Sequence, residues 1–207
     1  MKVISIANAK GGTGKTAITF NLAGTMKNNG KSVLVIDNDV QGNLTQAFNV
    51  NVKGKYTMYD IFTDKRIGFN DVIVNVEDKI DIIPNSIDSS ELEDMLSSKG
   101  MRDAILQRKF ETIPSNYDYV LIDNSPYIGT QVKNAIAISD CYIGVIDTSI
   151  DSLKGLQILD KKIKNDIIET LLNTNIKCLG IIWNMYNPRT NFGKEMAQYL
   201  NENLKDR

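Results

Sequence analysis

The chain has 207 residues, of which 42% are hydrophobic, and a formal net charge of −1 at pH 7. This length predicts a single domain over residues 1–207 with a buried core. The near-neutral charge excludes a globally basic nucleic-acid or membrane binder, so either contact requires a local patch. The absence of histidine excludes histidine acid–base catalysis and histidine metal sites.

Cysteine usage and the lack of export signals indicate the compartment. Cys141 and Cys178 are far apart in the sequence, and each lies in an apolar run. We therefore interpret them as reduced core residues rather than as a disulfide or a metal pair. No signal peptide or membrane-length apolar run is visible, which predicts a cytoplasmic protein.

The first predicted unit is a strand, a glycine-rich turn and a helix. The apolar run Val3–Asn8 predicts the strand and Thr16–Asn28 predicts the helix, with the turn Lys10-Gly11-Gly12-Thr13-Gly14-Lys15-Thr16 between them. Glycines allow backbone N–H groups to converge on phosphate oxygens, and the helix N-terminus adds the positive end of its dipole. This context predicts a phosphate-binding loop.

Two side chains of this turn have predicted roles. The Lys15 ammonium contacts the β- and γ-phosphates of a nucleotide, and the Thr16 hydroxyl ligates Mg²⁺. The strict phosphate-loop pattern has glycine where this chain has Ala9, and a second lysine, Lys10, follows directly. The loop therefore predicts binding of a nucleoside triphosphate in a variant form of the motif.

Apolar runs alternate with helix-period segments along the rest of the chain. Further predicted strands are Ser32–Asp37, Ile80–Pro84, Tyr119–Asp123, Tyr142–Ile146 and Cys178–Trp183. Further predicted helices are Ser90–Leu96, Met101–Phe110, Gln131–Ala137, Ser152–Leu172 and Phe192–Leu204. This alternation predicts an α/β fold, a doubly wound and mostly parallel sheet flanked by helices. The polar stretch 49–79 predicts an insertion at the sheet edge, with a short helix over Tyr56–Phe62.

Acidic residues follow two of the predicted strands, at the edge where ligands bind in such sheets. Asp37 and Asp39 end one strand and Asp123 ends another. Beside a phosphate loop, one carboxylate of the pair organises Mg²⁺ and its waters while the other orients the attacking water. The Asp123 carboxylate is placed to hold Mg²⁺ directly or through water. The alternative interpretation of the pair is an exposed Asp-Asn-Asp turn.

Together these clusters resemble the ParA/MinD family of deviant Walker ATPases, and in particular its small plasmid- and chromosome-partition members. The resemblance is carried by Lys10–Thr16, Asp37–Asn43, Tyr117–Pro126 and Gly180–Thr190. It implies a P-loop NTPase fold of the deviant Walker, SIMIBI-like type, with ATP and Mg²⁺ as cofactors. It further implies a homodimer that sandwiches two nucleotides.

The resemblance also assigns roles to individual residues. Lys10 reaches the partner subunit's ATP, while Lys15 serves the phosphates of its own subunit. Asp39 positions the hydrolytic water, Asp37 supports the Mg²⁺ shell, and Asp123 matches the Walker B carboxylate. The resemblance thus implies that the catalytic residues are Lys10, Lys15 and Asp39. The implied Mg²⁺-binding residues are Thr16, Asp37 and Asp123.

The nucleotide contacts implied by the resemblance extend beyond the loop. Asn184 lies in a segment similar to the family's adenine-recognition region, where an amide pairs with the N6 donor and the N7 acceptor, and Pro188 shapes the adjacent loop. The alternative for Asn184 is a strand-end turn residue. The predicted nucleotide-binding residues are Gly11, Gly12, Thr13, Gly14, Lys15, Thr16, Ala17, Asn184 and Pro188.

Three positions depart from the family pattern. Val40 stands where the family usually has proline, Ala17 replaces a hydroxyl residue, and Asn124-Ser125 replaces a frequent Cys-Pro pair. None of these departures deletes a charged participant. They bear on the rate of hydrolysis rather than on nucleotide binding.

Two helices have candidate interaction faces. On Ser152–Leu172, Lys154, Lys161 and Lys164 lie opposite or beside an apolar face and form a candidate patch for DNA phosphates; a solvated basic face is the alternative. The apolar stripe of the last helix predicts core packing, because the tail is short and mixed in charge. We therefore expect no stable membrane association.

The leading functional hypothesis is an ATP-driven dimerisation switch for DNA partition. The ATP dimer binds DNA non-specifically and is nucleoid-associated, and a centromere-binding partner of the ParB or ParG kind stimulates slow ATP hydrolysis and release. One alternative is a MinD-like regulator that positions a membrane or protein cargo. Another is an ATP-binding scaffold without hydrolysis. An iron–sulfur reductase is not expected, because Cys141 and Cys178 lie away from the phosphate-site loops.

Overall fold

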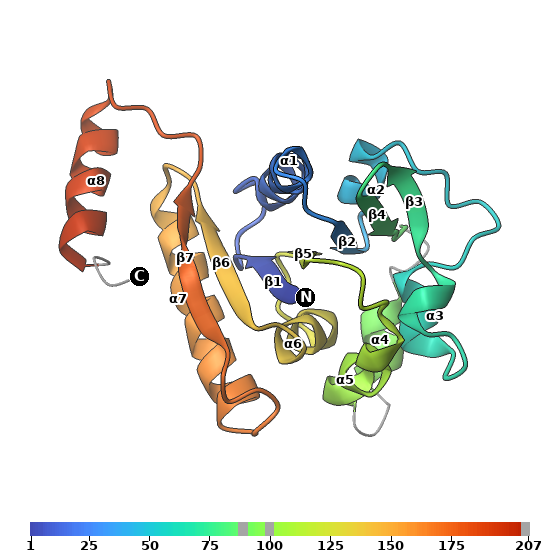
Figure 1. Ribbon diagram of the computed structural model, residues 1–207. Coiled ribbons are helices and arrows are strands. Elements are labelled where there is room, and N and C mark those ends of the chain that lie inside the picture. The colour runs from blue at the N-terminus through green and yellow to red at the C-terminus, as the bar shows by residue number, and fades with distance from the viewer. Residues whose placement is uncertain (87–90, 98–101, 204–207) are drawn as a thin grey trace.

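The computed structural model describes residues 1–86, 91–97 and 102–203. Within these ranges one seven-stranded sheet has the order β3-β4-β2-β5-β1-β6-β7 (Figure 1). All neighbouring strands are parallel except β3, which runs antiparallel to β4. The strands are β1 (Lys2–Ala7), β2 (Val33–Asn38), β3 (Val74–Glu77), β4 (Ile80–Ile83), β5 (Tyr119–Asn124), β6 (Cys141–Ile146) and β7 (Lys177–Trp183). The predicted fold class is confirmed.

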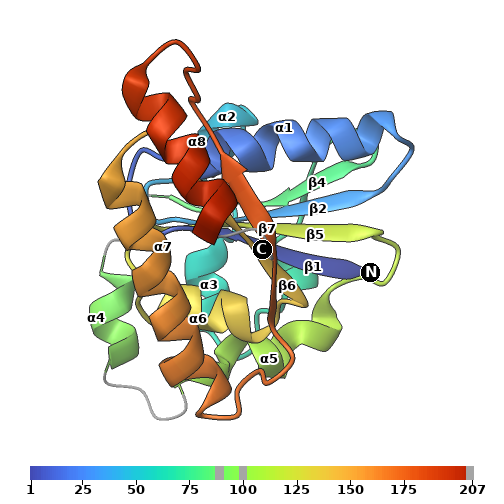
Figure 2. The same ribbon diagram turned by 90° about the vertical axis from the view of Figure 1, so that its left-hand side faces the viewer.

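Helices cover both faces of this sheet (Figures 1 and 2). One face carries α1 (Lys15–Asn28) and the short α2 (Asn43–Ala47). The other carries α3 (Met58–Thr63), α4 (Leu92–Ser97), α5 (Ile105–Lys109), α6 (Thr130–Ala137) and α7 (Ile150–Ile163). The last helix, α8 (Asn191–Asn203), lies beyond the β7 edge (Figure 1).

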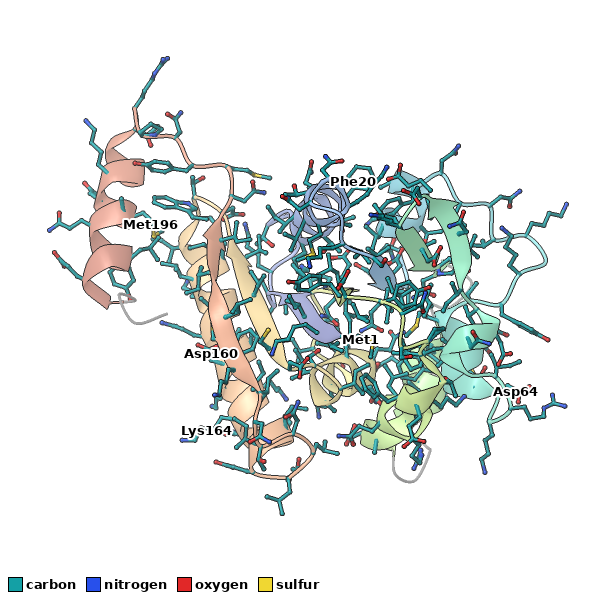
Figure 3. All side chains as sticks on the ribbon, viewed as in Figure 1. Met1, Phe20, Asp64, Asp160, Lys164 and Met196 are labelled. Carbon is teal, nitrogen blue, oxygen red and sulfur yellow. The ribbon has the colours of Figure 1, made fainter. Side chains whose placement is uncertain are left out.

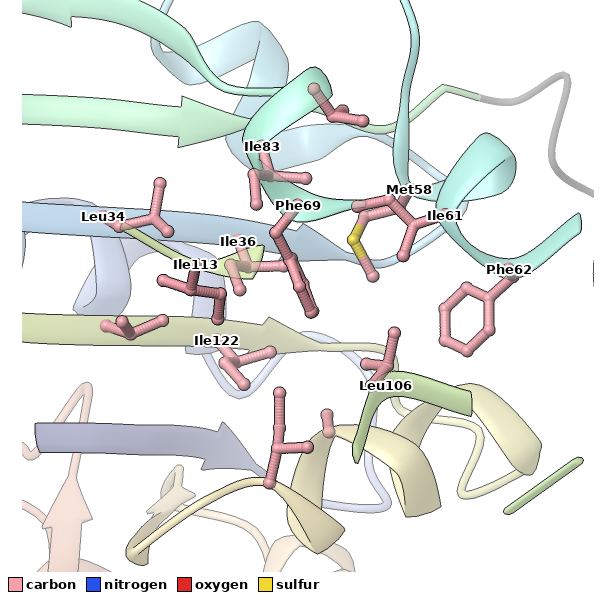
Figure 4. Close-up of a cluster of buried hydrophobic side chains, with 14 of the residues drawn as sticks. Leu34, Ile36, Met58, Ile61, Phe62, Phe69, Ile83, Leu106, Ile113 and Ile122 are labelled. Carbon is pink, nitrogen blue, oxygen red and sulfur yellow. The ribbon is translucent and has the colours of Figure 1, made fainter. Parts of the chain in front are cut away.

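The core consists of apolar clusters on the two faces of the sheet. On the α3–α6 face, Phe69 packs among Ile36, Ile122 and the residues of α3 (Figure 4). On the α1 face, Ala23 of α1 packs against β1, β2 and β5. Because both faces are covered, strands such as β2 are buried at every position, which is why they appear as continuous apolar runs in the sequence.

Helices α7 and α8 extend the core toward β7. The predicted apolar face of α7 is buried, with Leu156, Leu159 and Ile163 each at most 5% exposed. On α8, Met196 is 5% exposed (Figure 3) and Leu200 packs against the same cluster as α7. The prediction that the last helix packs on the core is confirmed for these residues. Across the described residues, the helices lack the combined length and apolar character needed to cross a membrane.

Several element boundaries differ from the predictions. Strand β3 was not predicted, because its residues alternate between half-buried and exposed and its pairing is shifted by a bulge. Helix α7 ends at Ile163 and continues as a π-helical turn over Lys164–Ile168, so the predicted helix to Leu172 is too long. The predicted ends Ser90, Met101 and Leu204 lie outside the described residues.

The remaining differences are local. The short helix predicted at Tyr56 begins instead at Met58, because Thr57 and Asp60 form a capping box at its N-terminus. The five residues of α2 were not predicted, since so short a helix has no measurable periodicity. Cys141 and Cys178 are both free thiols, as expected.

Candidate functional site

The glycine-rich loop lies between β1 and α1, at the carboxyl edge of the sheet. Gly14 is the N-cap of α1 with φ +94°, a backbone conformation that favours glycine. A Cβ at Gly14 would also collide with the Asn184 amide. That amide donates from Nδ2 to the Thr13 carbonyl oxygen at 3.0 Å. The loop is therefore held from one side by the residue that follows β7.

Lys15 extends from the first turn of α1 back under the loop. Its side chain is 6% exposed, and its Nζ donates to the Lys10 carbonyl oxygen at 3.1 Å. Burial lowers the pKa of Lys15, while the Asp123 and Asp39 carboxylates oppose this effect. A buried ammonium with one carbonyl partner is placed to bind an anion in the loop.

Asp123 is the penultimate residue of β5, beneath the same loop. It is 1% exposed, and neither carboxylate oxygen has a hydrogen-bond partner. Burial raises the pKa of Asp123 to about 7. The Thr16 hydroxyl lies close enough to lower that pKa, although it does not complete a hydrogen bond of standard geometry. A buried carboxylate without partners beside a threonine hydroxyl fits the ligand chemistry of Mg²⁺.

Asp37 and Asp39 lie at the end of the neighbouring strand β2. Asp37 is fully buried, and one of its oxygens accepts hydrogen bonds from the Thr45 backbone N–H at 2.8 Å and hydroxyl at 2.7 Å. Burial raises the pKa of Asp37 to about 6, against the opposing effect of Thr45. Asp39 is 8% exposed and accepts from the Gln41 N–H at 3.1 Å. The exposed-turn alternative for this pair is wrong.

Asp37 and Asp123 lie in register on neighbouring strands, and Asp37 and Asp39 both act electrostatically on Asp123. Even so, among residues 1–86, 91–97 and 102–203 no group of three or more His, Cys, Asp or Glu side chains has the geometry of a metal cage. Mg²⁺ is commonly held by one or two protein groups together with phosphate oxygens and waters. The site fits that mode of binding rather than an all-protein cage.

Lys10 forms an ion pair with Asp147 of the same chain. Asp147 follows β6, the strand next to β1, and its other oxygen accepts from the Ser149 N–H at 2.8 Å and hydroxyl at 2.6 Å. Burial opposes ionisation, but hydrogen bonds from Lys10 and Ser149 lower the pKa of Asp147 to about 2. Asp147 was not predicted; its position directly after an apolar strand was the one sequence feature that it shares with the predicted acidic residues.

The remaining predicted residues form the rim of the site. Gly11, Gly12, Ala17 and Pro188 are exposed. Asn184 is half-buried and bound to the loop, so its amide contacts Thr13 where the sequence predicted an adenine contact. Next to it, the Trp183 and Tyr186 rings pack with centroids 4.3 Å apart. The structure thus brings Asn184 to the loop and leaves Pro188 on the open side.

Comparison with known protein families decides the assignment. A family model described as an AAA domain matches residues 1–178. The sporulation initiation inhibitor protein Soj of Bacillus subtilis is 30% identical over 207 residues, covering all of this chain and 81% of Soj. The chain belongs to the ParA-type ATPase family. Two uncharacterized relatives from Mycobacterium tuberculosis strains are 32% identical, and the chain spans 64% of their length.

Solved structures agree with this ParA-type assignment. A putative plasmid partition protein of Borrelia burgdorferi bound to AMPPNP has a TM-score of 0.79 and 26% identity, covering all of this chain and 81% of that one. Cobyrinic acid a,c-diamide synthase of Mycobacterium smegmatis, solved with an ATP analog and magnesium, has a TM-score of 0.88. At 22% identity over 98% of this chain and 82% of that one, it supports the fold alone.

Proposed function

We propose that this chain is an ATPase that dimerises on ATP and acts in DNA partition. The observation that carries the proposal is that a glycine-rich loop has beneath it both a buried Lys15 ammonium and a buried Asp123 carboxylate whose oxygens accept no hydrogen bond. This arrangement suits the triphosphate and Mg²⁺ of a bound nucleotide. Soj, which is 30% identical, and a partition protein that binds AMPPNP support the same assignment.

In this proposal, Lys15 and the loop N–H groups bind the phosphates. Thr16 and Asp123 hold Mg²⁺, which neutralises charge on the phosphate oxygens, and Asp37 supports its hydration shell. Asp39, which directly follows β2, orients the attacking water. Asn184 fixes the loop by its hydrogen bond to the Thr13 carbonyl oxygen. In the nucleotide-bound state its side-chain amide also contacts the adenine. The reaction needs no covalent nucleophile, so positioning and charge stabilisation account for catalysis.

The partition role adds a second subunit, DNA and a partner protein. Lys10 supplies its charge to the ATP of the opposite subunit, so hydrolysis depends on dimerisation. The dimer binds DNA non-specifically, and a centromere-binding protein of the ParB or ParG kind stimulates hydrolysis and release. Under these conditions the protein is nucleoid-associated. Chromosome partitioning protein ParA of Caulobacter vibrioides, 28% identical over 210 residues, supports this role.

The first experiment separates ATP binding from ATP hydrolysis. Lys15→Ala is expected to lose binding of a fluorescent ATP analogue, because the phosphates lose their buried cation. Asp39→Ala is expected to retain binding and dimerise on ATP, with turnover lowered at least about tenfold. Phosphate release and light scattering measure these outcomes. Hydrolysis by Asp39→Ala at the parental rate would remove that residue as the water-positioning group.

The second experiment tests the DNA patch. Lys154, Lys161 and Lys164 are exposed, although Lys154 pairs with Asp151 at 3.3 Å. Replacing all three with alanine is expected to weaken DNA binding at equal ATP occupancy. The salt dependence should also flatten, by a slope of about 0.9 for each DNA phosphate that the protein no longer neutralises. The matched control replaces the exposed Lys31, Lys53 and Lys55, which changes the net charge equally.

The outcomes also separate partition from the alternative of a membrane-positioning regulator. DNA binding that requires ATP supports partition, whereas ATP-dependent binding to anionic vesicles without DNA binding overturns it. Equal weakening in the patch and control variants would mean that net charge, not the patch on α7 and its π-helical turn, carries DNA binding.

A further inference from the structure

A buried cluster of amides lies on the opposite face of the strands that carry the acidic residues. Asn38, Asn124 and Gln131, which we call the amide cluster, are 0%, 1% and 6% exposed. Asn38 of β2 pairs in register with Asn124 of β5, just as Asp37 pairs with Asp123. Because side chains alternate across a strand, the acidic pair faces the loop and the amide pair faces α6.

The amide cluster is joined by hydrogen bonds across four segments. Asn38 Nδ2 donates to Asn124 Oδ1 at 2.9 Å and to the Gln131 carbonyl oxygen at 3.3 Å. Asn124 Nδ2 donates to the carbonyl oxygens of Ile6 at 3.2 Å and Ile122 at 3.3 Å. The cluster therefore ties β2, β5 and β1 to the start of α6.

Two polar atoms of the amide cluster are buried without a partner. They are Asn38 Oδ1, an acceptor, and Gln131 Nε2, a donor. Buried amide groups are almost always paired. The two atoms are chemically complementary, and the Asn38 side chain already contacts the Gln131 backbone carbonyl. One hydrogen bond between them would satisfy both.

The positions of these residues connect the cluster to the chemistry. Asn38 lies between Asp37 and Asp39, and Asn124 directly follows Asp123. Gln131 is in the first turn of α6, where Glu93 of α4 accepts from the Thr130 N–H at 2.5 Å and the Gln131 N–H at 3.4 Å. A shift of the α6 start thus acts on both acidic strand ends at once.

We propose that the amide cluster positions Asp39 and Asp123 for hydrolysis, and that nucleotide binding closes a hydrogen bond from Gln131 Nε2 to Asn38 Oδ1. The inference rests on the proposed ATPase function and deepens it. Asn38, Asn124 and Gln131 act as positioning residues, since they lie on the face of the sheet opposite the phosphate loop. Asn124, which stands where the family frequently has cysteine, is then a member of this hydrogen-bonded cluster.

The test compares turnover with nucleotide affinity. Gln131→Met keeps the side-chain length and removes the donor, and Asn38→Leu removes the acceptor. Each is expected to lower kcat about fivefold, the equivalent of one ordinary hydrogen bond, while Mg-ATP affinity stays within twofold. The double variant is expected to lose less than the product of the two, because both single changes remove the same bond.

A control at the other end of α6 separates positioning from stability. Ser139, just after α6, is 3% exposed, and its Oγ donates to the Ala135 carbonyl oxygen at 2.7 Å. Ser139→Ala is expected to lower the melting temperature without changing kcat for the folded protein. Unchanged kcat in Gln131→Met, or multiplicative losses in the double variant, would overturn the inference. Absence of hydrolysis in the parental protein would instead overturn the proposed function.

A measurement on the unmodified chain tests the same hydrogen bond without any substitution, and so does not depend on whether the variants fold. The side-chain amide signal of Gln131 in an ¹⁵N NMR spectrum is expected to shift and exchange more slowly when AMPPNP and Mg²⁺ bind. Gln198 on α8, whose Nε2 donates to Glu202 at 2.9 Å, is the reference. Binding of AMPPNP with an unchanged Gln131 signal would overturn the closure of the hydrogen bond.

Discussion

Asp123 is held where its ionised form is unfavourable, because burial removes water and neither oxygen has a hydrogen-bond partner. Its pKa is about 7 instead of 3.8. Burial also raises the pKa of Asp37 on the adjacent strand, to about 6, although its hydrogen bonds from Thr45 act in the opposite direction. Such residues contribute little folding stability and are instead ready to bind a cation. The acidic strand ends are therefore suited to ligand binding rather than to stabilising the fold.

The first prediction concerns the pH dependence of stability. The folded protein binds the Asp123 proton more tightly than the unfolded chain, so this group stabilises the fold at acidic pH and the contribution is lost as pH rises through about 7. Without Mg²⁺, the free energy of unfolding is expected to fall between pH 5 and pH 8. Asp123→Asn is expected to be more stable than the parent at pH 8 by roughly 2–4 kcal/mol.

Denaturant unfolding in EDTA at several pH values measures this difference. Asp78→Asn, at an exposed position, removes the same charge and serves as the control. Equal pH profiles for the parent and Asp123→Asn would show that the buried carboxylate does not control stability in this range. The same variant is expected to lose the stabilisation that Mg-ATP gives the parent.

At this scale, the sequence predicted the residues whose chemistry is local to a motif. Lys15 and Asp123 were predicted because one lies in a glycine-rich turn and the other follows an apolar run. Asp147 was not found, since it lies 137 residues from its partner Lys10 and their contact depends on β6 lying beside β1. Gln131 was likewise not found, because a glutamine in a helix gives no signal until its partner Asn38 is known.

At the scale of elements, α7 and the phosphate loop pack directly on each other. Asn8 links them: its Oδ1 accepts from the Lys10 N–H at 2.8 Å, and its Nδ2 donates to the Ser152 carbonyl oxygen at 2.9 Å. Gly155 of α7 lies against this linkage, and a Cβ there would collide with Asn8 Oδ1. The helix that carries the candidate DNA patch is thus in contact with the loop that carries Lys10.

The second prediction tests this packing by exchanging glycines. Gly155→Ala is expected to destabilise the protein by about 1–3 kcal/mol, because the methyl group overpacks the contact with Asn8. Since the loop must shift to accept it, Mg-ATP binding is expected to weaken as well. Gly24→Ala is the matched control: Gly24 is inside α1 with nothing within 4 Å of an added Cβ. It is expected to stabilise the protein by about 0.5–1 kcal/mol.

Thermal unfolding and nucleotide titration of both variants provide the measurement. A Gly155→Ala protein as stable as Gly24→Ala would mean that α7 is not packed tightly on the loop. A drop in stability with unchanged nucleotide affinity would mean that the contact supports the fold and not the site.

Element prediction succeeded where burial was continuous and failed where it was partial. The strand that became β2 is apolar at each position up to Asp37 and was found. Strand β3 lies at the sheet edge with exposed alternate residues and was missed. The end of α7 was missed for a different reason: the π-helical turn at Lys164–Ile168 keeps Ile167 buried, so the apolar spacing continues beyond the α-helix.

At the scale of the whole molecule, the proposed dimer would give Lys10 a second position that competes with the one in the single chain. In the single chain its ammonium pairs with Asp147, with the two side chains 31% and 11% exposed. In the proposed dimer it must reach the ATP of the opposite subunit. Because one ammonium cannot hold both positions, dimerisation on ATP has to break the Lys10–Asp147 pair. The cost of breaking it sets part of the threshold for assembly.

The third prediction follows from this competition. Asp147→Asn weakens the hold on Lys10, so ATP-dependent dimerisation is expected at about two- to fivefold lower protein concentration, the equivalent of a partly exposed ion pair. Lys10→Ala is expected to bind ATP and remain monomeric. Light scattering over a protein dilution series with AMPPNP and Mg²⁺ measures both. Asp151→Asn, which breaks the surface pair with Lys154, is the control.

The two variants must move in opposite directions for the competition to hold. If Lys10 acted only within its own subunit, Lys10→Ala would dimerise like the parent, and Asp147→Asn would leave the threshold unchanged. If Asp147 instead contributed to the dimer interface, Asp147→Asn would raise the threshold. Asp147→Asn is expected to lower the protein concentration needed for dimerisation. If this effect disappears when Lys10→Ala is added, the effect acts through Lys10. That result would make the intrachain ion pair a restraint on assembly rather than a support of the fold.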